Sequence, residues 1–205
     1  MPIIIDKEVN SNSHLVVWHI TESLDELISM VNTEDLRAIN ERFVNNKKLE
    51  TLATRLCVAH LCNISQQGYY GIKKDDWGKP HLIKSNAHIS IAHSFPYAVA
   101  TINLSEPTGI DVEQRREQLL RIKHKFLSNS ELEFCKDDLD LLTQAWCAKE
   151  VLYKIHGRKK LSFKYELPIK IYKNKVFGRI LEGSSFADHE LKIDRIADYW
   201  LVYKS

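Results

Sequence analysis

The segment from Asp140 to His156 restricts the fold more than any other, because its apolar residues would cover most of a helix's circumference. At about 100° per residue, the polar residues Thr143, Glu150 and Lys154 fall together on one narrow strip. A helix that is apolar nearly all round is buried, so this strip must face a partner, a cavity or a ligand. Lys149 lies away from the strip and needs a separate explanation.

Helix and strand patterns around this segment divide the chain into two halves of mixed type. The first half predicts strands at 15–20, 88–91 and 97–102, and helices at 24–30, 33–43 and 48–63, with Ser23 and Glu26 as a capping signal. The second half predicts strands at 109–113, 168–172, 176–180, 190–193 and 199–203. It predicts helices at 118–126 and 140–156, and a short helix between them that begins after the cap at Ser128. We therefore expect an α+β protein with two similar α+β halves, 1–105 and 106–205, packed tightly without a flexible linker.

Composition excludes several classes of protein. The net charge of +2 is too small to indicate a nucleic-acid partner by itself. No stretch approaches the ~20 apolar residues of a membrane span, and the N-terminus turns acidic before a signal-peptide core could form. We expect a cytoplasmic protein with no membrane contact. The four cysteines form no C-x-x-C pair, so buried free thiols are expected rather than a zinc site.

Three carboxylates stand in apolar surroundings, where an unpaired charge is costly to bury. Asp111 and Glu113 lie two apart in a predicted strand, so they share one face while Ile110 and Val112 point into the core. The simpler alternative is a half-buried strand with outward polar residues. Glu150 and Lys154 could likewise form a surface ion pair of ~0.2–0.5 kcal/mol. A magnesium ion, which prefers oxygen ligands, would explain all three acids together.

Two further segments carry groups suited to phosphate. Lys79 follows Gly78 and precedes Pro80 in a constrained turn, where it could hold a phosphate as a point charge or simply be exposed. His93, followed by Ser94, ends a predicted strand and could bind phosphate or shuttle a proton.

The order of these segments is more specific than any one of them. Gly78-Lys79-Pro80, a strand ending in His93-Ser94, Gly109–Glu113 and Trp146–Lys154 follow one another as they do in the 4′-phosphopantetheinyl transferase superfamily, Sfp type, which this chain resembles. Phe126–Glu131 also resembles the family's Phe-x-Ser-x-x-Glu segment. The resemblance runs from about Arg42 to about Gly157.

The resemblance implies a fold and a site. It implies two α+β halves related by a pseudo-twofold, with coenzyme A at their junction. It implies magnesium bound by residues matching Asp111, Glu113 and Glu150, and a catalytic or phosphate-facing role for Lys154. For coenzyme A it implies Lys79, Pro80, His93, Ser94 and, near the nucleotide phosphate, Arg55.

The chain departs from the family pattern at two places. Ala92 stands where family members often have Ser, which removes a hydroxyl near the nucleotide. The glycine-rich stretch that often follows the last motif is replaced by the basic segment His156-Gly157-Arg158-Lys159-Lys160.

The expected activity is magnesium-dependent transfer of 4′-phosphopantetheine from coenzyme A to a serine of an apo acyl or peptidyl carrier protein, as in a holo-[acyl-carrier-protein] synthase. Adenosine 3′,5′-bisphosphate would be released, Glu150 would be the general base, and the protein would be a monomer. Fatty acid, polyketide, nonribosomal peptide and lysine-pathway carriers all remain possible. The first alternative is a non-catalytic coenzyme A or nucleotide-binding protein of the same fold. The others are a structural module and another magnesium phosphotransferase. No G-x-x-x-x-G-K-[ST] loop is present to support the phosphotransferase.

Overall fold

The structure, a computed structural model, describes residues 2–157 and 160–205. It divides into two compact units, Met1–Thr108 and Gly109–Ser205, a division three residues beyond the boundary expected after residue 105. The basic segment at 156–160 includes residues 158 and 159, which lie outside the described residues.

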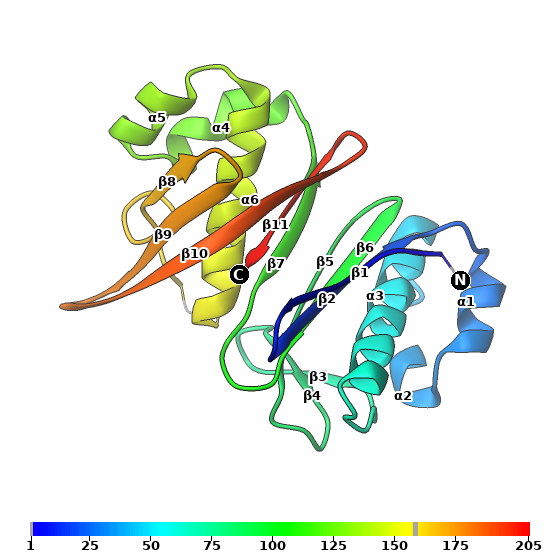
Figure 1. Cartoon of the computed structure of the whole chain (residues 1–205). Coiled ribbons are helices and arrows are strands. Elements are labelled where there is room, and N and C mark those ends of the chain that lie inside the picture. The colour runs from blue at the N-terminus through cyan, green and yellow to red at the C-terminus, as the bar shows by residue number, and fades with distance from the viewer. Residues whose placement is uncertain (1, 158–159) are drawn as a thin grey trace. The chain divides into compact units, whose positions relative to one another are not determined.

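The first unit contains one long helix and a four-stranded sheet (Figure 1). Its elements are β1 (Ile3–Asn10), β2 (Ser13–His19), α1 (Leu24–Met30), α2 (Thr33–Leu36), α3 (Asn45–Ile64), β3 (Ile72–Lys74), β4 (Pro80–Leu82), β5 (His88–Ser94) and β6 (Tyr97–Asn103). The sheet order is β1-β2-β6-β5, all antiparallel, and β3 and β4 form a separate hairpin. Helix α3 packs on β2, β5 and β6 and buries Leu52, Val58 and Leu61 completely.

The second unit repeats this plan with a five-stranded sheet (Figure 1). Its elements are β7 (Ile110–Gln114), α4 (Gln118–Phe126), α5 (Asn129–Cys135), α6 (Leu139–His156), β8 (Ile169–Tyr172), β9 (Lys175–Glu182), β10 (Ser185–Ile196) and β11 (Tyr199–Lys204). The sheet order is β7-β11-β10-β9-β8. Helix α6 lies across this sheet, and the fully buried Leu142, Val151 and Leu152 form the centre of its core.

The two units share a strand connectivity. In each, the strand that precedes the long helix lies beside the last strand, which in turn pairs antiparallel with the strand before it. This gives β2-β6-β5 in the first unit and β7-β11-β10 in the second. The mixed α+β class is thus confirmed.

The largest errors of the sequence prediction lie in the first unit. Strand β1 was not predicted. Its burial alternates, but Ile3, Ile4 and Ile5 are all apolar, so the sequence does not show the alternation at the start of the strand. The helix predicted over 33–43 ends at Leu36. Beyond that point the Asn40 side chain accepts a hydrogen bond from the Arg42 N–H, and such local bonds compete with a continuing helix.

Other expectations hold. Both predicted caps form capping boxes, Ser23 with Glu26 and Ser128 with Glu131. The four cysteines are free and buried. In the part of the chain that the structure describes, every helix is too short or too polar to cross a membrane.

Gly109 allows α6 to approach the start of β7. A Cβ atom at this position would lie 2.6 Å from the Val151 carbonyl oxygen, closer than van der Waals contact permits. The approach matters because the polar strip of α6 faces β7, as described below.

Replacing Gly109 by Ala should therefore lower the free energy of unfolding by about 2 kcal/mol, measured by urea denaturation. Gly68→Ala is the control, because a Cβ there meets the exposed side chain of Tyr70 rather than backbone. An equal effect of the two substitutions would contradict this explanation.

Candidate active site

Strand β7 and helix α6 bring two of the predicted site residues into contact. The Lys154 ammonium donates to Asp111 Oδ1 at 2.7 Å and to the Ile110 carbonyl oxygen at 2.8 Å. Both side chains are buried, with 7% of Lys154 and 8% of Asp111 exposed. A buried ion pair is stable only when further hydrogen bonds satisfy its polar atoms, and here one atom is unsatisfied. Asp111 Oδ2 is buried without a hydrogen-bond donor among the described residues.

Strand β7 is buried on both faces at Ile110, Asp111 and Val112. Asp111 pairs with Val202, which belongs to the core that α6 covers. Ile110 and Val112 are buried on the opposite face, outside that cluster. The expected burial of Ile110 and Val112 is therefore confirmed, and the face that carries Asp111 is buried as well, which alternation did not predict. Asp111 thus faces α6, where Lys154 of the polar strip contacts it.

Glu113 lies on the same face of β7 as Asp111, in strongly negative surroundings. Burial, followed by the charge of Asp111, raises the pKa of Glu113 to about 7, and Glu150 adds to the rise. Arg116, 3.2 Å from Glu113, and Lys154 act in the opposite direction. Like-charged carboxylates shift in this way when they are close together, so the three acids form one electrostatic cluster.

Cys147 and Thr143 complete the polar strip of α6. Burial, followed by the charges of Asp111 and Glu113, raises the pKa of Cys147 well above its usual value. The Thr143 hydroxyl instead donates to the Leu139 carbonyl oxygen within its own helix, at 2.6 Å. The strip thus presents Glu150, Lys154 and a neutral thiol to the acids of β7.

The chemistry of these donors fits a hard cation. Carboxylate oxygens are the ligands that Mg²⁺ prefers, and Asp111 Oδ2 has no donor to satisfy it. Among residues 2–157 and 160–205, however, no three His, Cys, Asp or Glu side chains lie close enough together to form a ready-made metal site. The fit therefore rests on the donor chemistry and the clustered charge rather than on an assembled ligand set.

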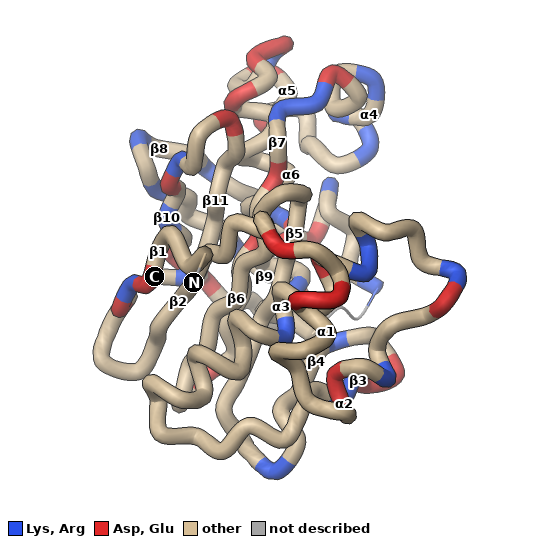
Figure 2. The backbone as a smooth tube through the Cα atoms, turned by 90° about the vertical axis from the view of Figure 1, so that its right-hand side faces the viewer, with Lys and Arg blue, Asp and Glu red and all other residues tan. Residues whose placement is uncertain are grey.

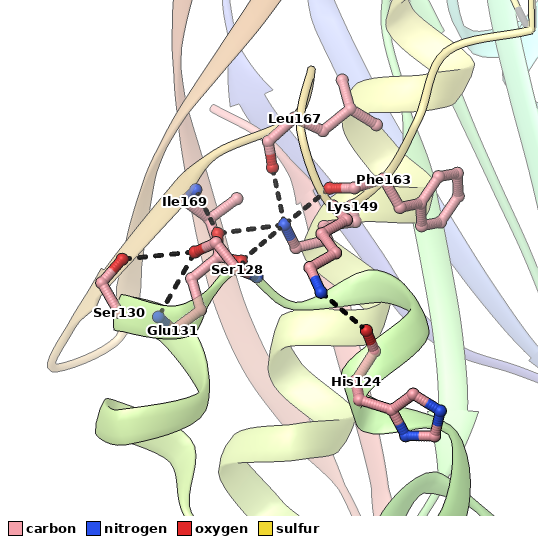
Figure 3. A network of polar contacts seen from close by, with 9 residues as sticks. His124, Ser128, Ser130, Glu131, Lys149, Phe163, Leu167 and Ile169 are labelled. Atoms are coloured by element: carbon pink, nitrogen blue, oxygen red, sulfur yellow. Dashed lines mark hydrogen bonds and ion pairs between the residues drawn. The ribbon is translucent and has the colours of Figure 1, made fainter.

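Lys149, next to Glu150 in the chain, is part of a different network (Figure 3). It is fully buried, and its ammonium donates to both carboxylate oxygens of Glu131, at 3.0 and 2.9 Å. It also donates to the carbonyl oxygens of Phe163 and Leu167, at 2.8 Å each. Lys149 thus ties α5 and the segment before β8 to α6, which explains a lysine placed away from the polar strip.

The first unit holds the remaining predicted residues. Asp75 Oδ1 accepts from the N–H groups of Trp77 and Lys79, which fixes the turn between β3 and β4. Pro80 is buried at the start of β4. Lys79 lines a basic pocket of about 680 Å³ together with Lys73, His81, Lys84 and His88.

His93 and Ser94 end β5, which runs three residues beyond the predicted strand at 88–91. Ser94 is buried, and 30% of the His93 side chain is exposed. Lys47 and Glu50 of α3 contact the His93 ring. Sequence reasoning did not single out these two residues. The predicted helix began at residue 48, after Lys47, whereas α3 begins at Asn45 and so includes both.

Arg55 lies in the interior of the first unit. Its Nε is 3.7 Å from Asp35 Oδ1, and the Tyr69 hydroxyl donates to the same oxygen at 2.7 Å. Among the described residues, Nε and Nη1 of Arg55 have no hydrogen-bond partner. Burial raises the pKa of Asp35, although Tyr69 and Arg55 act against this.

Comparison with known proteins points to the same family as the sequence motifs. A model of the 4′-phosphopantetheinyl transferase superfamily matches residues 107–177, which run from the segment before β7 into β9. A curated 4′-phosphopantetheinyl transferase of Bacillus subtilis is 29% identical over 150 residues, covering 67% of this chain. The match spans 65% of the length of that relative. The matched family region contains Asp111, Glu113, Glu150 and Lys154, and both comparisons confirm the similarity of this chain to the 4′-phosphopantetheinyl transferase superfamily.

Proposed function

We propose that the protein transfers the 4′-phosphopantetheine group of coenzyme A to a serine hydroxyl of an apo carrier protein. The serine oxygen attacks the phosphorus that bears the pantetheine arm, the pyrophosphate P–O bond breaks, and adenosine 3′,5′-bisphosphate leaves. The observation that carries the proposal is the buried Asp111–Lys154 pair with its unsatisfied Oδ2, beside two further acids.

Each residue of the pair has a distinct role. Lys154 holds Oδ1 of Asp111 and so leaves Oδ2 directed to a different partner. Its ammonium also places a fixed positive charge where negative charge develops during transfer. Glu150, one helical turn before Lys154 on α6, takes the proton of the attacking hydroxyl as general base.

Asp111, Glu113 and Glu150 would hold the magnesium ion. Bound there, Mg²⁺ would supply Lewis-acid polarisation of the pyrophosphate oxygens. The pKa of Glu113 is raised first by burial and then by the charges of Asp111 and Glu150, against Arg116 and Lys154, and a bound cation would lower it.

The first unit would bind the nucleotide part of coenzyme A. Lys79 and His93 supply groups for phosphate, while Pro80 and Ser94 shape the strand ends that carry them. Arg55 has unsatisfied donors, but it is buried against Asp35, so its contribution would be to hold α3 near the nucleotide.

The carrier protein would approach a basic surface. Figure 2 shows Lys and Arg along the segment from the end of β7 through α4. These residues are Arg115, Arg116, Arg121, Lys123 and Lys125. Carrier proteins are commonly acidic, and opposite charge accelerates encounter.

Incubation with coenzyme A, Mg²⁺ and an apo carrier protein should increase the carrier's mass by one phosphopantetheine group. Chelation of the metal should abolish the gain, and added Mg²⁺ should restore it, because the acids then regain their cation. Mass spectrometry of the carrier is the measurement, with a carrier whose serine is replaced by Ala as control.

The result also separates the alternatives. Binding of coenzyme A without any mass gain, across fatty acid, polyketide and nonribosomal peptide carriers, would favour a non-catalytic binding protein. Mass gain that persists after chelation would contradict the magnesium assignment.

A further inference from the structure

Trp200 lies beside the acids of β7, on the same face of the sheet. It is directly opposite Glu113, and Val202, two residues further along β11, is opposite Asp111. Opposite residues of an antiparallel pair share a face, and their Cβ atoms are about 5 Å apart. The indole is therefore the neighbour of the Glu113 side chain on the side of β11. Trp200 belongs to none of the motifs on which the family resemblance rests, so its position needs an explanation.

The orientation of the Trp200 ring is fixed by two contacts. Its Nε1 donates to Asp140 Oδ1, in the first turn of α6, at 2.9 Å. The guanidinium carbon of Arg195, which is opposite Trp200 on β10, lies 5.2 Å from the centre of the ring, within the range of a cation–π interaction. Arg115 Nε is 3.3 Å from the same Asp140 oxygen and balances its charge.

Glu113 needs a restraining neighbour more than Asp111 does. Asp111 is short, and Lys154 holds it at 2.7 Å in a buried pair. Glu113 has the longer side chain, and its ion pair at 3.2 Å is with Arg116, whose side chain is 55% exposed. Exposed ion pairs restrain their partners only weakly. Packing against the fixed ring of Trp200 is therefore the stronger restraint on the Glu113 side chain.

We propose that Trp200 is a positioning residue for Glu113, and that Asp140 acts on Glu113 through the indole. The ring limits the rotamers open to Glu113 and keeps its carboxylate next to Asp111, so that the acids are arranged before a cation binds. The inference rests on the proposed function, because it concerns residues that would hold magnesium. Trp200 and Asp140 themselves do not contact the cation.

Binding of Mn²⁺ to the full chain, measured from the paramagnetic resonance signal of the free ion, tests the inference without turnover. Mn²⁺ takes the same oxygen ligands as Mg²⁺. Trp200→Leu should weaken Mn²⁺ binding about tenfold, because removing a group that orients a metal ligand typically weakens binding about 10- to 100-fold. Trp200→Phe keeps a ring beside Glu113 and should recover part of that loss.

Val176→Ala is the control for a general effect of packing. Val176 is fully buried in the same core but lies on β9, three strands away from β7 in the sheet. Its truncation leaves a cavity and should lower the urea midpoint, yet change Mn²⁺ affinity less than about twofold, because the cavity is remote from Glu113. Equal weakening of Mn²⁺ binding by Trp200→Leu and Val176→Ala would show that Trp200 only packs.

The second arm uses Asp140, which is partly exposed at the start of α6, so its replacement should leave the fold intact. Asp140→Ala removes the acceptor of Trp200 Nε1 and should weaken Mn²⁺ binding about fivefold, through the loss of one hydrogen bond. Asp140→Asn keeps an oxygen acceptor and should stay within about twofold of wild type. Equal losses for the two variants would assign the effect to the charge of Asp140 and overturn its action through the ring.

Failure of this inference is distinguishable from failure of the proposed function. If the wild type modifies a carrier but binds no Mn²⁺ by itself, or if Trp200→Leu and Val176→Ala behave alike, the prearranged site is wrong and the transferase stands. If the wild type neither binds Mn²⁺ nor modifies a carrier, both are overturned.

Discussion

Glu150→Gln is expected to reduce phosphopantetheine transfer at least about a hundredfold, because general-base catalysis contributes roughly 10²–10⁴. The amide keeps the size and polarity of the side chain but cannot accept the serine proton. Since Glu150 is only half-buried, the free energy of unfolding should change little. Mass spectrometry of the carrier gives the rate, and urea denaturation gives the stability.

Glu133→Gln provides the control for this experiment. Glu133 is an exposed acid on α5, and its replacement makes the same change in net charge. It should leave both turnover and stability near wild type. Turnover by Glu150→Gln equal to that of Glu133→Gln would remove Glu150 from the catalytic role.

Lys149→Met is expected to lower the free energy of unfolding by about 3–5 kcal/mol, the usual cost of leaving one partner of a buried ion pair unpaired. Glu131 would remain as a buried carboxylate, and the Phe163 and Leu167 carbonyl oxygens would lose their donor. Desolvation lowers the pKa of Lys149, against the opposing effect of Glu131. Burial thus makes the cation itself costly, and its four acceptors compensate for that cost.

Lys175→Met is the matched control. Lys175 pairs with Glu190 at 2.7 Å, but both side chains are well exposed, and such pairs contribute about 1 kcal/mol or less. A double variant, Lys149→Met with Glu131→Gln, should recover part of the loss because no unpaired charge remains. A loss for Lys149→Met no larger than for Lys175→Met would show that the buried network does not stabilise the second unit.

The second unit was the more predictable one because its signals are local. The apolar circumference of 140–156 and the capping signal at Ser128 with Glu131 each depend on residues within one or two turns, and α6 and α5 form where these signals place them. The polar strip likewise predicted that Glu150 and Lys154 face something other than solvent.

What sequence reasoning missed depends on contacts between distant segments. Helical spacing placed Lys149 away from the polar strip, but it could not identify Glu131, 18 residues earlier, as the partner of Lys149. The face of β7 that carries Asp111 depends on which side α6 covers, and alternation alone is the same for either side. The contacts of Lys47 and Glu50 with His93 also join α3 to β5 across more than 40 residues.

The position of Glu131 has a consequence for solubility. Strand β8 is the outermost strand of its sheet, and Glu131 Oε1 accepts the N–H of Ile169 in that strand at 2.9 Å. Unpaired backbone groups on an edge strand are a template for pairing with another chain. Glu131 occupies one of these donors, so we expect its loss to leave the edge more open to pairing with a second copy. Glu131 therefore has two effects. Its loss would remove the partner of Lys149 and would also free a backbone N–H at the edge of the sheet.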